Sequence, residues 1–248
     1  MNGMQNILGH LRRADDDFNL ISDGDKIAVA LSGGKDSLTL LGALVNYQKF
    51  GLKRFELVAI TVDCTDGEAN YSEITKFCES MGVKHYIEPS QIFKIVFDIR
   101  KEKSACSLCA KLRRGIVNSA AKSLECNKVA LGHHSDDMIE TFLLCMLYEG
   151  RLSTLKPKTY LSRTDITVIR PLIYASEKEI IGVSKTFPIL NNLCPVNGHT
   201  KREYMKQLVG QLSRDIPTAR ERIEDAVQQL LKNDLTKKQS MSNTSIWH

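Results

Sequence analysis

A strand, a glycine turn and a helix follow one another without a break over residues 26–50, and this unit constrains the fold more than any other feature. The strand is the aliphatic run Lys26–Leu31, which has no polar residue after its lysine, as expected of a strand covered on both faces. The turn is the hexapeptide Ser-Gly-Gly-Lys-Asp-Ser at 32–37. Apolar residues then recur at helical spacing from Leu38, and Gly51 is expected in the left-handed position that ends a helix.

Strands and helices continue to alternate along the chain. Such alternation predicts an α/β fold of the Rossmann-like type, with a parallel sheet, right-handed crossovers and helices on both faces. Further strands are expected at Phe55–Val62, Val83–Ile87, Lys128–Leu131 and Ile166–Ile169, and further helices at Tyr71–Met81, Gln91–Arg100, Leu108–Leu124, Ser135–Tyr148 and Ser176–Lys185.

The pattern changes after residue 188, where turn-forming residues precede two amphipathic helices with basic faces at Lys201–Leu212 and Pro217–Leu231. The residues after them are polar and are expected to be frayed. We therefore predict an α/β domain at 1–188 with an N-terminal helix and an inserted helix that carries a Cys-x-x-Cys pair, a C-terminal cysteine-containing turn with helices at 189–231, and a flexible tail at 232–248.

Composition excludes several classes of protein. A chain of 248 residues with 42% hydrophobic residues supports a full core and excludes disorder of the whole chain. No run approaches the roughly 18–20 apolar residues of a membrane span, and the N-terminus lacks the layout of a secretory signal, so we expect a cytoplasmic protein without membrane association. The net charge of +5 is compatible with a polyanionic partner but does not by itself indicate one.

The hexapeptide at 32–37 is the strongest chemical signal in the chain. Its two glycines let the backbone turn tightly, and its successive N–H groups and the following helix start favour an anion. The lysine adds a positive charge, and the two serines add hydroxyl donors. The spacing differs from those of the P-loop and of dinucleotide sites. We predict that this turn binds phosphate; the alternative is a glycine turn that only links strand to helix.

The hexapeptide resembles the pyrophosphate-binding loop of the PP-loop ATPases, which cleave ATP to AMP and pyrophosphate while activating a carbonyl or carboxyl group as its adenylate. This resemblance implies the adenine nucleotide alpha hydrolase-like version of the fold. A second segment, 131–141, also follows a strand and opens a helix, and it resembles the G-H-x-x-D-D-x-x-E-T element of tRNA-modifying members of the superfamily. Acidic groups beside a triphosphate can hold Mg²⁺ through its waters. The alternative makes Asp136 and Asp137 charges at a helix start, and His133 a turn residue.

Asp63 ends the second strand at the same edge of the predicted sheet as the hexapeptide. In the superfamily this edge receives the adenosine portion of the nucleotide, whereas an ordinary strand-ending aspartate is the alternative. The resemblance implies that Lys35 and Asp137 act in catalysis. It implies a nucleotide site formed by Ala30, Ser32, Gly33, Gly34, Lys35, Asp36, Ser37, Asp63, Gly132, His133, Asp136 and Asp137.

Seven cysteines in a chain without an export signal favour a reducing compartment over a disulfide framework. Cys106 and Cys109 form a Cys-x-x-Cys pair at a predicted helix start, where nearby cations are expected to lower the thiol pKa. Two thiolates at this spacing can hold one metal ion, but a structural zinc site needs four ligands and the sequence has no second such pair. We expect the remaining thiols of the core elements to be buried: Cys64, Cys78, Cys126 and Cys145.

Cys106, Cys109 and Cys194 together resemble the three-cysteine pattern of the 2-thiocytidine tRNA-thiolating family and its thiouridine-forming relatives. In these enzymes three thiolates bind a [4Fe–4S] cluster and leave one iron open. The competing interpretations are a catalytic persulfide on one of the paired cysteines with a resolving partner, a zinc site completed by His199, and buried structural thiols. The chain is shorter than the well-known bacterial 2-thiocytidine enzymes, and its lack of further Cys-x-x-Cys pairs argues against the thiouridine-forming relatives.

The resemblance implies an ATP-dependent tRNA sulfurtransferase that uses ATP, Mg²⁺ and a [4Fe–4S] cluster. Sulfur would come from a cysteine desulfurase persulfide or from sulfide, and the family suggests a homodimer. Arg113, with Lys111 and Arg114, is expected to steady developing negative charge or a tRNA phosphate, unless these residues form a solvated helix face.

Two alternatives keep the nucleotide site but differ in function. One is a PP-loop tRNA enzyme of the thiouridine or lysidine type, with another base or nucleophile. The other is a module that binds a nucleotide and an iron–sulfur cluster without catalysis. For a tRNA substrate, sequence-independent backbone contacts are expected from Lys201, Arg202, Lys206, Arg214, Arg220 and Arg222.

Overall fold

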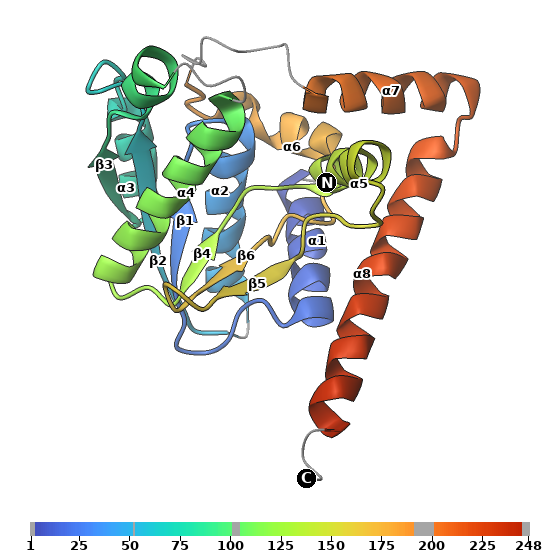
Figure 1. Ribbon diagram of the computed structural model, residues 1–248. Helices are drawn as coiled ribbons and strands as arrows, with labels where there is room; N and C mark the ends of the chain where they lie inside the picture. Colours follow the sequence, from blue (N-terminus) through green and yellow to red (C-terminus); the bar gives the residue numbers. More distant parts are fainter. Residues whose placement is uncertain (1–2, 52, 101–104, 191–200, 245–248) are drawn as a thin grey trace. The chain divides into compact units, whose positions relative to one another are not determined.

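The computed structural model describes residues 3–51, 53–100, 105–190 and 201–244, with side chains up to residue 233. Six strands form one sheet in the order β3-β2-β1-β4-β6-β5 (Figure 1). This order places β1 in the interior of the sheet. The strands are β1 (Lys26–Ala30), β2 (Glu56–Asp63), β3 (Lys84–Pro89), β4 (Lys128–Ala130), β5 (Lys158–Leu161) and β6 (Ile166–Ile169).

One strand departs from the predicted parallel sheet. The pairs that join β1, β2, β3, β4 and β6 are parallel, but β5 runs antiparallel to β6 at the sheet edge. The sequence analysis missed β5 because its four residues, Lys-Thr-Tyr-Leu, alternate between exposed and half-buried and form no apolar run. An antiparallel edge strand on an otherwise parallel sheet is common in α/β proteins.

The chain divides into two compact units, residues 1–134 with 157–196 and residues 135–156 with 197–248. The first unit contains the sheet. Its helices are α1 (Gly3–Phe18), α2 (Lys35–Phe50), α3 (Ser72–Ser80), the π-helix η1 (Lys94–Ile99), α4 (Ala105–Ser123), α6 (Glu177–Val183) and the 3₁₀ turn η2 (Ser184–Thr186).

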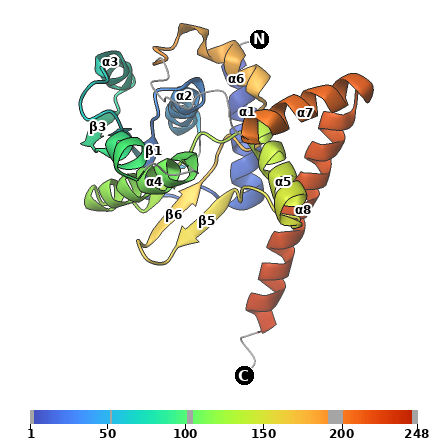
Figure 2. The same cartoon turned by 45° about the horizontal axis from the view of Figure 1, so that its top comes forward.

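Helices cover both faces of the sheet, which confirms the predicted fold class. α4 packs on one face, and α2 packs on the other with α1 and α6 beside it (Figure 2). The side chains of the strands alternate between these layers. On the α4 side, Ala28, Val58, Ile60 and Val129 pack against Val117 and its neighbours on the helix.

Gly51 ends α2 as predicted, but not in the left-handed conformation. Its φ of −82° and ψ of 165° are extended, and its N–H donates to the Tyr47 carbonyl oxygen at 2.6 Å. An added Cβ would collide with that oxygen, so the close approach explains the glycine.

The second unit consists of three helices that pack on one another, α5 (Ser135–Glu149), α7 (Lys201–Asp215) and α8 (Ala219–Thr244). Ile139 and Leu143 of α5 form a small core with Met205 of α7, and Leu208 and Ile223 pack against it. The predicted helix that ended at Leu231 continues to Thr244. The predicted domains divide the chain at residues 188 and 231, whereas these units group α5 with the C-terminal helices.

Within the described residues, no helix combines the length and apolar character needed to cross a membrane.

Candidate active site

The loop between β1 and α2 is held in shape by its own two serines. The Ser37 hydroxyl donates to the Gly34 carbonyl oxygen at 3.0 Å and accepts from the Ser32 N–H at 3.2 Å. The Gly34 N–H donates to the Ser32 hydroxyl at 3.3 Å. These hydrogen bonds hold the loop in a defined conformation, as a phosphate-binding turn requires.

Gly33 is the residue of this loop that only glycine suits. Its φ is +80°, in the left-handed region that side chains disfavour. An added Cβ would also lie 2.7 Å from the Leu190 side chain and 3.0 Å from that of Ile74, while the Leu190 N–H donates to the Gly33 carbonyl oxygen. The loop backbone is thus covered closely on one side by apolar side chains.

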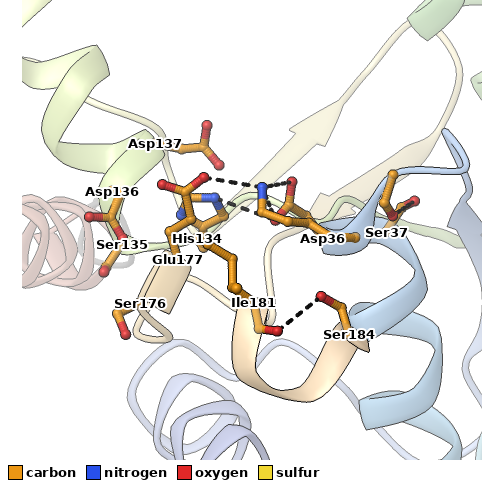
Figure 3. Close-up of polar contacts among 12 residues, drawn as sticks. Asp36, Ser37, His134, Ser135, Asp136, Asp137, Ser176, Glu177, Ile181 and Ser184 are labelled. Carbon is orange, nitrogen blue, oxygen red and sulfur yellow. Dashed lines mark hydrogen bonds and ion pairs between the residues drawn. The ribbon is translucent and has the colours of Figure 1, made fainter. Parts of the chain in front are cut away.

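Lys35 is the first residue of α2, and its ammonium lies between two carboxylates, those of Glu177 and Asp36, which Figure 3 labels. Its Nζ is 3.1 Å from Oε1 of Glu177 and 3.2 Å from Oδ1 of Asp36. Burial lowers the pKa of Lys35, but the two carboxylates outweigh burial and raise it, so the side chain is a stable cation. Sequence reasoning missed Glu177; the only signal for it was an acidic residue at a helix start just after a strand of the same sheet.

The chain that leaves β4 touches the loop directly. An added Cβ on Gly132 would lie 3.0 Å from backbone atoms of Asp36 and Ser37, so glycine permits this backbone approach. His134 is buried, and its Nε2 is 3.6 Å from Oδ1 of Asp36 (Figure 3). His133 is the predicted site residue of this adjacent pair, and the structure places His134 beside Asp36. A pattern of residues cannot tell which of two neighbouring histidines turns toward a loop.

Asp63 is buried at the end of β2, and its carboxylate organises the loop that follows. It accepts hydrogen bonds from the N–H and hydroxyl of Thr65, the N–H of Gly67 and the hydroxyl of Tyr71. Burial raises the pKa of Asp63, but these hydrogen bonds outweigh burial and lower it. Ala30 ends the neighbouring strand β1, so the two predicted adenosine-site residues lie on adjacent strands.

The paired cysteines sit at the start of α4 and differ in exposure. Cys106 is exposed and Cys109 is buried. The thiol of Cys64, which follows β2, lies beside that of Cys109, and Nη2 of Arg113 is 3.9 Å from the Cys109 sulfur. The Cys64 contact and the Arg113 charge outweigh burial and lower the pKa of Cys109. A lowered pKa was predicted from cations and the helix start, but its largest cause, Cys64, was not.

Cys64, Cys78, Cys126 and Cys145 are buried, as predicted. Cys64 also belongs to the surroundings of the paired cysteines, which the sequence analysis did not anticipate. Cys194 and His199 lie outside the described residues. Within the described part of the chain, no group of three His, Cys, Asp or Glu side chains stands ready to hold a metal ion. Lys111 and Arg114 are exposed on α4.

In the second unit, Arg202 of α7 binds the acidic start of α5. Its guanidinium lies 2.8 Å from Oδ1 of Asp137, 3.3 Å from Oε2 of Glu140 and 3.1 Å from the Thr141 hydroxyl. Asp137, Glu140 and Thr141 of α5 therefore share one arginine. This pairing explains Arg202 better than the predicted contact with a tRNA phosphate.

Arg220 of α8 binds the two residues just before Asp137. Its guanidinium lies 2.9 Å from Oδ1 of Asp136 and 3.2 Å from the Ser135 hydroxyl, and it also contacts Glu224 on its own helix. Burial lowers the pKa of Arg220, but the carboxylates outweigh it and raise it. Arg220 is thus a structural cation of this unit, where the sequence analysis expected an RNA contact.

Comparison with known proteins agrees with this geometry. Residues 8–189 match the PP-loop domain family. The tRNA-cytidine(32) 2-sulfurtransferase of Geobacter sulfurreducens is 40% identical over 84% of this chain and 83% of its own length. The enzymes of the same name from Citrifermentans bemidjiense and Pseudomonas fluorescens are 38% and 36% identical, over 94% and 93% of this chain and 96% and 85% of their own.

The fold is shared with a solved structure, that of the U34-tRNA thiolase NcsA from Methanococcus maripaludis with its [4Fe-4S] cluster. The two superpose with a TM-score of 0.69 at 23% identity, over 90% of this chain and 78% of the other. The likeness to that structure concerns the fold. The chain belongs to the PP-loop family and, within it, to the family of the tRNA-cytidine(32) 2-sulfurtransferases.

Proposed function

We propose that this protein is an ATP-dependent tRNA sulfurtransferase that adenylates the C2 oxygen of a tRNA cytidine and replaces that oxygen with sulfur, which yields 2-thiocytidine. The observation that carries the proposal is the loop at 32–37, which its own hydrogen bonds hold in shape. It has a positive-φ glycine and a lysine at the start of α2, in a chain whose relatives bear this activity in their names. From those names we infer cytidine 32 as the target.

In the proposed reaction, backbone N–H groups of the loop at 32–37 hold the β- and γ-phosphates of ATP, and the Lys35 ammonium offsets their charge. The C2 oxygen of the cytidine attacks the α-phosphorus, and pyrophosphate leaves. A sulfide nucleophile then attacks C2, and AMP departs with the former C2 oxygen. Ala30 and Asp63 are proposed to line the adenosine portion.

Gly132, His133, Asp136 and Asp137 are proposed to complete the nucleotide site together with Mg²⁺. The carboxylates of Asp136 and Asp137 each hold an arginine. A carboxylate can hold Mg²⁺ through the water molecules that the ion usually keeps. Asp137 is proposed as the carboxylate of this group that catalysis requires.

Cys106, Cys109 and Cys194 are proposed to hold a [4Fe–4S] cluster. The described cysteines fit this role, because they are sulfur donors one helical turn apart and the lowered pKa of Cys109 favours the thiolate that binds iron. When bound, such a cluster supplies iron that can take a sulfur ligand. Arg113 is proposed to balance negative charge beside Cys109, which its guanidinium contacts.

The proposed partners are a tRNA and a sulfur donor, either sulfide or a cysteine desulfurase persulfide. Because Arg202 and Arg220 are engaged by α5, we assign contacts with the tRNA backbone to the other basic residues of α7 and α8. We also propose that the protein acts as a homodimer in the cytoplasm, where tRNA is found. The residues assigned to contacts with the tRNA backbone are Lys201, Lys206, Arg214 and Arg222.

Two measurements test the function. Mass spectrometry of tRNA nucleosides from a strain that lacks the protein should show the loss of 2-thiocytidine, and the wild-type gene should restore it. The anaerobically purified protein, given ATP, sulfide and this tRNA, should form AMP and 2-thiocytidine. Loss of a thiouridine or of lysidine in the strain would assign another base or nucleophile. No AMP with any tRNA would favour a binding module without catalysis.

A further inference from the structure

The carboxylate of Glu177 lies where an anion is not expected, next to the lysine of a phosphate-binding loop. Its Oε1 is 3.1 Å from Nζ of Lys35 (Figure 3). A carboxylate this close to bound phosphates would repel them, unless its charge is already balanced. The Lys35 ammonium provides that balance. The role of the ion pair between Glu177 and Lys35 is therefore the question that the site raises.

The cap of α6 holds the backbone at Glu177. Ser176 caps α6: its hydroxyl accepts from the Glu179 N–H at 3.3 Å, and its own N–H and hydroxyl donate to the Glu179 carboxylate at 2.9 and 2.7 Å. This reciprocal cap fixes the first turn of the helix, where Glu177 is the first residue. The carboxylate is therefore presented to Lys35 from a rigid element.

The ammonium is held at two points. Glu177 approaches it from α6 and Asp36 from α2, at 3.1 and 3.2 Å. All three side chains are between about a fifth and a third exposed, so solvent screens the pair only in part. An ammonium has three N–H donors, and contacts with two carboxylates direct the remaining donor.

We propose that Glu177 is a positioning residue that, together with Asp36, orients the Lys35 ammonium toward the phosphates of ATP. This inference rests on the proposed role of Lys35 in ATP binding. Glu177 then acts on the rate through Lys35 and needs no contact with ATP itself. A long lysine side chain without this second contact would sample several rotamers, and misplacement of a charge by about 1 Å can lower a rate by up to about 100-fold.

The proposal predicts an unusual pair of kinetic changes in Glu177→Gln. The glutamine removes a competing anion, so the phosphates attract Lys35 at least as strongly and the KM for ATP should stay the same or fall. It also removes the ion pair that orients the ammonium, so kcat for AMP formation should fall about tenfold. Glu177→Asp keeps the charge and should restore part of kcat.

Glu179→Gln is the matched control on the same helix. Glu179 completes the helix cap and contacts His10 at 3.0 Å, so this variant should lower the melting temperature. It retains the ion pair between Glu177 and Lys35, so its kcat should fall by less than that of Glu177→Gln, whose melting temperature should stay at the wild-type value. Both variants are assayed as the iron-loaded enzyme with unmodified tRNA, and ATP affinity is measured separately by calorimetry.

Each outcome of the experiment decides between the hypotheses. A wild-type kcat in Glu177→Gln, a raised KM with unchanged kcat, or a loss of melting temperature like that of Glu179→Gln would overturn the positioning role. Lys35→Ala separates this failure from that of the proposed function. If Lys35→Ala forms AMP at the wild-type rate, Lys35 has no role in the reaction; if it is inactive while Glu177→Gln is unaffected, only the inference about Glu177 fails.

Discussion

The guanidinium of Arg202 lies 2.8 Å from the carboxylate of Asp137, although the two residues are 65 positions apart in the chain. The same guanidinium reaches Glu140 and Thr141, so one side chain of α7 satisfies three residues on one face of α5. Such a fork of donors cannot be replaced by the single ammonium of a lysine. The acidic element of α5 is thus also the docking site of α7.

We therefore predict that Arg202→Ala lowers the free energy of unfolding by about 1–2 kcal/mol. A fully buried pair would cost more, but the Arg202 side chain is 41% exposed, which weakens the ion pairs. Urea denaturation followed by circular dichroism measures the change. Arg214→Ala, at an exposed position of the same helix, should stay within about 0.5 kcal/mol of the wild type. Equal stabilities of the two variants would contradict the docking role.

Glycine positions of the first unit should respond to alanine in opposite directions. Gly33→Ala places a side chain at φ +80° against Leu190, and should cost about 1–3 kcal/mol of stability and weaken ATP binding. Gly132→Ala should also weaken ATP binding, because its Cβ would press on the backbone of the loop. Gly9→Ala lies in α1 with no atom within 4 Å of the added Cβ, and should raise stability by up to about 1 kcal/mol.

Thermal melts and ATP calorimetry on the three glycine variants test this contrast. The prediction fails if Gly33→Ala and Gly132→Ala bind ATP as the wild type does. It also fails if Gly9→Ala is the most damaging of the three.

The strand–turn–helix unit at 26–50 could be predicted because its signals are local. An apolar run, a pair of glycines and a helical repeat each depend only on neighbours in the sequence. The predicted sheet followed from the repetition of this unit. β5 was not predicted, because an edge strand needs apolar residues on one face at most. Its four residues therefore form no apolar run that would indicate a strand.

The contacts of Glu177, His134 and Cys64 could not be predicted, because each joins segments far apart in the chain. Glu177 meets Lys35 only because β6 and β1 both border β4 in the sheet. Cys64 meets Cys109 because α4 packs on β2. The sequence pattern reveals that a residue is charged or sulfur-bearing, but strand order and helix packing determine its partner. Arg202 and Arg220 were assigned to RNA for the same reason.

Asp63 should make stability depend on acid pH. Its lowered pKa means that the carboxylate contributes stability above the unfolded-state pKa of about 4, and that this contribution is lost as the pH falls through the lower folded-state pKa. Asp63→Asn cannot accept all of the same hydrogen bonds, and should be about 1–2 kcal/mol less stable at pH 7. The gap between variant and wild type should narrow below about pH 4.

Urea denaturation between pH 7 and pH 3 measures this gap. Asp98→Asn, at an exposed position of η1, is the control and should follow the wild type at every pH. A gap that stays constant down to pH 3 would mean that the Asp63 hydrogen bonds do not favour its charged form.

The cysteines provide a prediction that is independent of the nucleotide site. If Cys106, Cys109 and Cys194 hold a [4Fe–4S] cluster, the anaerobically purified protein should be brown, with about four irons per chain. Replacement of any of the three by serine should remove most of the iron and the 2-thiocytidine product. Lys35→Ala, in contrast, should keep the iron and lose the product.

Cys126→Ser is the matched control for these variants. Cys126 is also buried in the α4 layer, where its sulfur is 3.8 Å from the Leu124 carbonyl oxygen, but it is not part of the paired-cysteine group. This variant should keep its iron and its activity. Iron analysis, visible absorption and nucleoside mass spectrometry report the result. If the Cys194→Ser variant contains no iron and still forms 2-thiocytidine at the wild-type level, the cluster has no part in the proposed reaction. Sulfur transfer would then depend only on the remaining thiols.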